Sequence, residues 1–240
     1  MAQTTQAELE GRLLNRDVFL RGFWRDNKLE FDRSGKPVRA FREGSFTVAG
    51  VRVTSVEIRH DGLLITGQRE GLAFGHDQMT QVPLGPEGGV KVRIHGRPGE
   101  DFGSALDAVF APNLPSLAPS LPEFWQPYAQ THFEGSQPDA APPTVTPQHK
   151  AGMSPPVVLR QMDPKFSPEA KAKGYSGMCR VRLNVLPDGT PDHLQITVPA
   201  GLGLDEQAIE SLLQYRFRPA QMDGHPVEVE LIVDVHFVMR

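Results

Sequence analysis

Apolar and polar residues alternate along a segment in the last third of the chain. From Met178 to Leu186 the two kinds of side chain take turns, which is the period of a strand with one buried face. Asp188-Gly189 then supplies a turn dipeptide, and the alternation resumes from His193 to Pro199. The pattern predicts a β-hairpin whose inner face belongs to a hydrophobic core.

A helix and a further strand follow this hairpin. Between Leu204 and Phe217 apolar residues recur at helical spacing, with Asp205 as the expected N-cap and Pro219 as the stop. Val227 to Val238 alternates again and predicts a long final strand. Three antiparallel strands carrying two helices on one face would form a two-layer module. Its expected core comprises Val181, Leu183, Leu212, Leu231, Val233 and Phe237.

The first half of the chain shows short apolar runs separated by turn signals. Strands are expected at Val18 to Trp24, Leu29 to Phe31, Val38 to Phe41, Phe46 to Val48, Val51 to Arg59, Leu63 to Gln68 and Val90 to Ile94. Short helices are expected at Ala7 to Leu14, Gly103 to Phe110 and Glu123 to Ala129. Strands at such close spacing favour a β-sandwich or a small open barrel. The predicted fold class of the whole chain is α+β.

A proline-rich stretch separates the two halves. Eleven of the 22 prolines lie between Pro112 and Pro156, and residues 134–154 contain few side chains able to anchor them to a core. The sequence therefore predicts a β-rich N-terminal module over residues 3–133, a linker over 134–154, and the two-layer module over 155–240.

Composition excludes several classes of protein. The formal net charge is −4 at pH 7 without a basic stripe, so no nucleic-acid partner is expected. The longest apolar runs fall far short of the ~20 residues of a spanning helix, so these residues are not expected to cross a membrane. Cys179, the single cysteine, falls on the core face of a strand, where we expect an inert thiol.

Residues with catalytic or metal-binding chemistry are sparse. The eight histidines form no close pairs on one helix or strand, and the chain has no nucleophile elbow and no phosphate-binding loop. We therefore expect no catalytic residues, no metal and no cofactor. The alternative is an enzyme with its site in the N-terminal module, where a cleft would bring His60, His76 or His95 together with carboxylates.

A series of landmarks runs from Pro155 to the C-terminus. It comprises Pro164 and Phe166 of a P-x-[aromatic] opening, Ala170, Gly174, Gly177, Asp188-Gly189, Leu204-Asp205, Ala208, the block Tyr215 to Ala220, and Gly224. In order and spacing these landmarks resemble the C-terminal domain of TonB, the periplasmic energy transducer of Gram-negative envelopes. The sequence departs from that family at Ser167, where proline is usual, and at Tyr215, where tryptophan is usual.

The resemblance implies a peptide-binding site. In the TonB family the last strand accepts an extended peptide, the TonB box of an outer-membrane transporter, as an added strand. The residues implied to contact the peptide here are Asp163, Pro164, Lys165, Phe166, Val229, Glu230, Leu231, Ile232, Val233, Asp234 and Val235. A homodimer formed through the same strand is the alternative arrangement.

The resemblance also implies a non-enzymatic role in TonB-dependent transport, in the periplasm. TonB transducers begin with a membrane anchor, whereas MAQTTQAELEGR is typical of a mature exported N-terminus. We expect that an export segment is missing from this chain and that a partner or a missing anchor provides any inner-membrane association. A structural or scaffolding envelope protein is the second interpretation, because one fold serves several functions.

Overall fold

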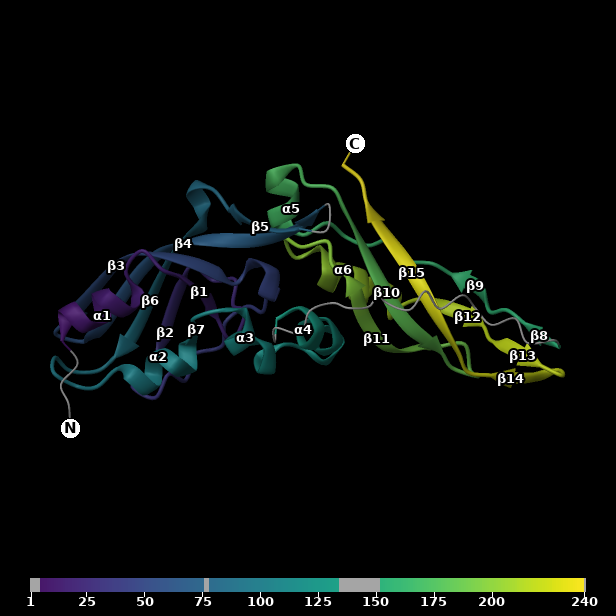
Figure 1. Ribbon diagram of the computed structural model, residues 1–240, viewed down its shortest axis with the longest axis horizontal. Coiled ribbons are helices and arrows are strands. Elements are labelled where there is room, and N and C mark those ends of the chain that lie inside the picture. Colours follow the sequence, from purple (N-terminus) through teal and green to yellow (C-terminus); the bar gives the residue numbers. More distant parts are fainter. Residues whose placement is uncertain (1–4, 76–77, 134–151, 240) are drawn as a thin grey trace. The chain divides into compact units, whose positions relative to one another are not determined.

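The computed structural model describes residues 5–75, 78–133 and 152–239. The chain divides into two compact units, Met1–Ser120 and Leu121–Arg240. Figure 1 shows helices and strands in both units, and the predicted α+β class is confirmed.

The N-terminal unit contains one sheet of seven strands. These are β1 (Asp17–Leu20), β2 (Lys28–Phe31), β3 (Gly50–Arg59), β4 (Gly62–Gly75), β5 (Gln78–Pro83), β6 (Gly89–His95) and β7 (Phe110–Ala111). The strand order is β2-β6-β4-β3-β1-β7, and β5 pairs with β4. β2 lies parallel to β6, and the other neighbours are antiparallel.

Helices pack on this sheet and close its core. The helical segments are α1 (Gln6–Leu13), η1 (Phe46–Val48), η2 (Pro86–Gly88), α2 (Gly103–Val109), α3 (Leu114–Leu117) and η3 (Ala118–Ser120), where η denotes a 3₁₀ helix. Thr5 and Glu8 form a capping box that starts α1. Leu9 and Leu13 of α1 and Leu106 of α2 join the alternate apolar residues of the strands in one hydrophobic cluster.

Several expectations for this unit were wrong. Phe46–Val48 is a 3₁₀ helix, because the Ser45 hydroxyl accepts a hydrogen bond from Thr47 N at 3.0 Å and starts a helical turn. Val38 to Phe41 forms no strand, and β5 was not foreseen. The sandwich or barrel is not confirmed, since the described strands of this unit belong to a single sheet.

The C-terminal unit is built around a three-stranded antiparallel sheet. Its elements are η4 (Glu123–Trp125), α4 (Gln126–His132), β8 (Met153–Ser154), β9 (Val157–Arg160), α5 (Pro168–Lys173), β10 (Gly177–Val185), β11 (Pro191–Val198), α6 (Leu204–Leu212), β12 (Arg216–Arg218), β13 (Ala220–Met222), β14 (His225–Val227) and β15 (Val229–Phe237). The main sheet has the order β11-β10-β15, and two small sheets, β12-β9 and β14-β13-β8, accompany it.

The predicted hairpin and most of the predicted core are present. Gly189 has φ 84° in the turn between β10 and β11, and Asp188 Oδ1 accepts a hydrogen bond from Thr190 N at 2.8 Å. Of the expected core residues, Val181, Leu183, Leu212 and Phe237 are buried. Leu231 and Val233 remain partly exposed, because their strand lies at the edge of the sheet. The expected final strand is interrupted at Glu228, which separates β14 from β15.

Asp205 has a different role from the predicted N-cap. α6 follows Gly203, which has φ 76° and no side-chain cap, and Asp205 lies inside the first turn. The Asp205 carboxylate is fully buried and accepts hydrogen bonds from Ala200 N at 2.7 Å and Gly201 N at 2.8 Å. Asp205 therefore stabilises the loop at Ala200 and Gly201 and does not cap the N-terminus of α6.

The boundary between the units differs from the sequence expectation. Leu121–Phe133, expected with the N-terminal module, belongs to the C-terminal unit. Most of the expected linker, residues 134–151, lies outside the described residues. Its last two residues, Met153–Ser154, form β8 and pair with β13.

Candidate functional site

The outer edge of β15 is one of the two edges of the main sheet. β15 pairs with β10 in one uninterrupted register from Val229 opposite Val185 to Phe237 opposite Gly177. Within the described part of the chain, no strand pairs with its other side. An unpaired strand presents backbone N–H and C=O groups that can pair with another extended segment.

The two faces of β15 differ in chemistry. On the face toward the core, Val235 and Phe237 are buried, whereas Leu231 and Val233 are only half-buried. On the outward face, Ile232 is 37% exposed, and its neighbours at alternate positions are the carboxylates Glu230 and Asp234. The edge therefore offers apolar contacts on one face and acidic ones on the other.

Ion pairs tie the outward face of β15 to β10. Arg180 donates to both carboxylate oxygens of Asp234, at 2.6 and 2.9 Å, and these hydrogen bonds lower the pKa of Asp234. Asn184 Nδ2 donates to Glu228 Oε1 at 2.6 Å. Arg182 Nε lies 3.8 Å from Glu230 Oε1, beyond hydrogen-bonding distance. Compensation of the acidic groups is therefore strongest at Asp234.

The predicted contact segment before α5 reaches β15 through its aromatic residue. The ring of Phe166 lies 5.5 Å from that of Phe237 in an edge-to-face arrangement, at the C-terminal end of β15. Asp163 lies near Tyr215: burial raises the pKa of Tyr215, and the Asp163 charge adds to the shift. Pro164 is half-buried and Lys165 is exposed, both in irregular backbone.

Ser167 forms hydrogen bonds at the start of α5. Its hydroxyl accepts a hydrogen bond from Ala170 N at 3.0 Å and so caps α5, with Pro168 at the first helical position. The same hydroxyl donates to the carbonyl of Leu202. Ser167 thus connects the start of α5 to the loop before α6.

Residues expected in the N-terminal module contact β11, the strand at the opposite edge of the sheet. η4 and α4 pack against β11, and Trp125, which is completely buried, donates from Nε1 to Glu206 Oε1 at 3.0 Å. Burial and the nearby charge of Asp205 raise the pKa of Tyr128, on α4, to about 12. The only sequence signal for this packing is the aromatic pair Phe124-Trp125 beside Tyr128. η4 and α4 thus contact β11, and β15 is the other edge strand of the main sheet.

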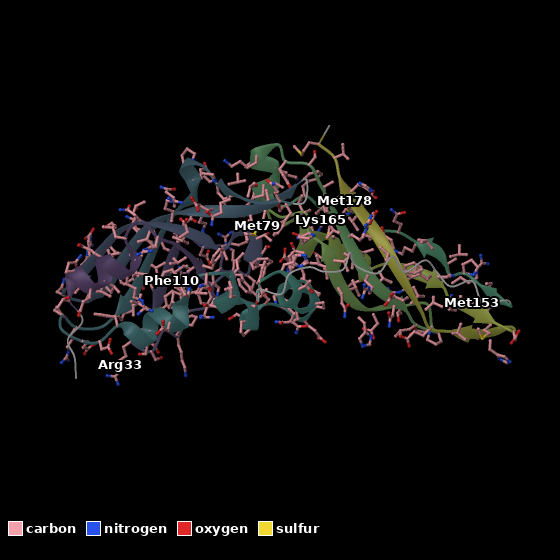
Figure 2. All side chains as sticks on the ribbon, viewed as in Figure 1. Arg33, Met79, Phe110, Met153, Lys165 and Met178 are labelled. Carbon is pink, nitrogen blue, oxygen red and sulfur yellow. The ribbon has the colours of Figure 1, made fainter. Side chains whose placement is uncertain are left out.

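Figure 2 labels one residue near each end of the C-terminal unit. Met178, at the start of β10, and Met153, on β8, lie toward opposite ends of the C-terminal unit, and β15 runs along the length between them. Met178 is paired with His236 of β15. The outer edge of β15 thus follows much of the long side of this unit.

The alternative site in the N-terminal unit consists of exposed polar groups. His95 Nε2 lies 3.6 Å from Glu30 Oε2, with both side chains nearly half exposed, and Arg93 forms an ion pair with Asp61. His60 lies in the turn between β3 and β4, and His76 falls outside the described residues. Within residues 5–75, 78–133 and 152–239, no group of three or more His, Cys, Asp or Glu side chains is placed to hold a metal ion.

The comparison with protein families agrees with the geometry of this sheet. The family model described as the Gram-negative bacterial TonB protein C-terminal matches residues 162–239. These residues form a TonB-type C-terminal domain. The match covers the main sheet, α5 before its first strand, α6 between β11 and β15, and all eleven residues of the implied peptide site. The resemblance stated from the landmarks is thereby confirmed.

Individual relatives are more distant. The chain is 27% identical over 106 residues to "Protein TonB" of Vibrio cholerae, a match that covers 44% of this chain and 43% of that protein. It therefore spans less than half of that relative's length. The solution structure of the Pseudomonas aeruginosa TonB C-terminal domain is 19% identical, with coverage of 39% of this chain and 94% of that one and a TM-score of 0.28. Across the described ranges, no helix has the length and apolar character needed to span a membrane.

Proposed function

We propose that the TonB-type domain binds an extended peptide by β-strand addition at the outer edge of β15. The peptide is the TonB box of an outer-membrane transporter, and the setting is the periplasm of a Gram-negative envelope. The observation that carries this proposal is that β15 pairs with β10 along its whole length and has no strand on its other side among the described residues.

The exposure of β15 supports strand addition in a second way. Leu231 and Val233 face the core but stay half-buried, so an added strand would cover apolar surface as well as pair the backbone. Phe166, packed on Phe237, marks one end of the peptide path. The protein acts in this proposal as a non-enzymatic binding component of TonB-dependent transport.

A titration of the whole chain with a TonB-box-like peptide tests the proposal. Amide resonances of Val229–Val235 should shift first, because their backbone groups form the new ladder. Two peptides N-methylated at alternate amides provide the control. Only the set of amides that faces β15 is needed, so one methylated peptide should lose binding and the other should keep it.

The contrary results are equally specific. If no resonance of β15 shifts at millimolar peptide while sedimentation shows a monomer, strand addition is excluded and a scaffolding role takes its place. If sedimentation shows a dimer that dissociates as peptide is added, the homodimer through β15 competes for the same edge.

A further inference from the structure

Strand spacing determines which side chains of the domain an added strand would meet. Neighbouring strands lie about 4.8 Å apart, so a peptide paired with β15 sits about twice that distance from β10. Directly opposite side chains on adjacent strands have Cβ atoms about 5 Å apart and interact strongly. Side chains on the outer face of the peptide would therefore meet Glu230, Ile232 and Asp234 before the arginines of β10.

The carboxylates on β15, and Glu228 just before it, are not equally neutralised. Asp234 engages Arg180 through both of its oxygens. Glu230 has its nearest cation, Arg182, at 3.8 Å, and Glu228 accepts its hydrogen bond from the neutral amide of Asn184. Negative charge is thus least compensated toward the start of β15, while Ile232 interrupts it with an exposed apolar side chain.

We infer that the peptide partner of this domain carries a basic residue opposite Glu230 and an apolar residue beside Ile232 on the same outward face. Its inward face is apolar, because Leu231 and Val233 are half-buried there. This inference rests on the strand addition proposed above and adds the side-chain chemistry of the peptide. A cation opposite Glu230 forms a cross-strand ion pair, whereas an anion there is repelled.

A second copy of the chain fits this edge less well in the register centred on Ile232. If two β15 strands paired antiparallel about Ile232, Glu230 of each copy would lie opposite Asp234 of the other. Like charges placed directly opposite each other destabilise a strand pair. The charge pattern therefore favours a basic peptide over self-association in the register centred on Ile232.

Three peptides that differ in one residue test the inference. In each peptide, valine occupies the inward positions. The outward positions contain leucine and one variable residue, which is Lys, Ser or Glu. Binding to the whole chain should follow the order Lys, Ser, Glu, with about a fivefold difference in Kd between Lys and Glu at low salt. About 0.5 M salt should narrow that difference, since the groups are exposed.

Two matched variants locate the selectivity. Glu230→Gln keeps the shape of the side chain and should bring the Lys and Glu peptides to nearly equal Kd. Glu210→Gln removes the same charge from an exposed position on α6 and should leave the order unchanged.

The outcomes separate the two proposals. Equal binding of all three peptides, with shifts in β15, overturns the charge selectivity and leaves strand addition standing. A preference for Lys that survives Glu230→Gln overturns the assignment to Glu230. The absence of β15 shifts with every peptide overturns strand addition itself, and tighter self-association than peptide binding overturns the choice of occupant.

Discussion

Gly189 shows how one residue sets the geometry of the main sheet. It has φ 84°, and a Cβ placed on it would lie 2.0 Å from the carbonyl oxygen of Phe217. Phe217 N also donates to the Gly189 carbonyl at 2.9 Å, so the turn packs tightly against the block that follows α6. Glycine is required here both for its backbone conformation and for its lack of a side chain.

Replacement of Gly189 by valine should therefore destabilise the domain by about 2 to 3 kcal/mol, through backbone strain and the clash together. Gly224 is the matched control, because it has φ 82° but no atom within 4 Å of the position that a Cβ would take. Gly224→Val should cost only about 1 to 2 kcal/mol. Chemical denaturation measures both, and equal losses would mean that contact with Phe217 contributes nothing.

Asp205 combines a buried carboxylate with two backbone donors. Burial raises the pKa of Asp205, and hydrogen bonds from Ala200 N and Gly201 N oppose the shift. Burial also raises the pKa of Cys179, whose thiol contacts this carboxylate, in accord with an inert thiol. An asparagine at position 205 would leave one of the two backbone N–H groups without an acceptor.

We expect Asp205→Asn to cost about 1 to 3 kcal/mol of unfolding free energy. The folded-state pKa is raised, so the stability that Asp205 supplies is complete below its unfolded pKa of about 4 and declines as pH rises toward the folded pKa. The difference between the native protein and Asp205→Asn should shrink from acidic to neutral pH. Chemical denaturation at several pH values measures this difference in unfolding free energy. A difference that grows as pH rises would contradict a raised pKa of Asp205 in the folded state.

At the scale of elements, the packing of η4 and α4 on β11 is the least expected feature of the C-terminal unit. Trp125 is fully buried there and reaches Glu206 at the start of α6. A short helical segment gains little from its own hydrogen bonds, so tertiary contacts must hold it in place.

Trp125→Ala should reduce the stability of the C-terminal unit by about 3 to 5 kcal/mol, the range for removal of a large buried ring. Trp125→Phe retains most of the packing and loses the bond to Glu206, with an expected cost of about 1 kcal/mol from the hydrogen bond. Hydrogen exchange of the β10 amides reports the change within this unit. Unaltered exchange in Trp125→Ala would show that the segment packs without supporting the sheet.

At the scale of the molecule, the C-terminal unit extends beyond the segment that matches the TonB family. The family model starts at residue 162, whereas the compact unit starts at Leu121. The additional residues include the helices that cover β11.

A fragment of residues 121–240 should accordingly unfold at a higher temperature than a fragment of residues 152–240. Both contain β8 and the TonB-type domain, so the comparison isolates the earlier residues. The shorter fragment should also self-associate more readily, because β11 loses its contacts with η4 and α4. Thermal unfolding and sedimentation provide the measurements. Identical unfolding temperatures for the two fragments would mean that the residues before 152 do not stabilise the C-terminal unit.

Local sequence patterns predicted the hairpin and the final strand of the TonB-type domain. Alternation predicted β10, β11 and the final strand, and Asp188-Gly189 located the hairpin, because period and turn chemistry are properties of neighbouring residues. The ordered landmarks identified the family for the same reason. Each of these signals is contained within a few positions of the chain.

Which elements pack against each other depends on long-range contacts that local sequence patterns do not contain. Apolar spacing shows that a face is buried but not what buries it, so the attachment of Trp125 to α6 was not predictable from Glu123 to Ala129. Asp205 likewise matched an N-cap pattern. In the structure its two carboxylate oxygens instead accept hydrogen bonds from the backbone N–H groups of Ala200 and Gly201. The half-burial of Leu231 and Val233, on which the proposed site depends, arises because β15 is at the edge of the sheet, and strand order is set by long-range pairing.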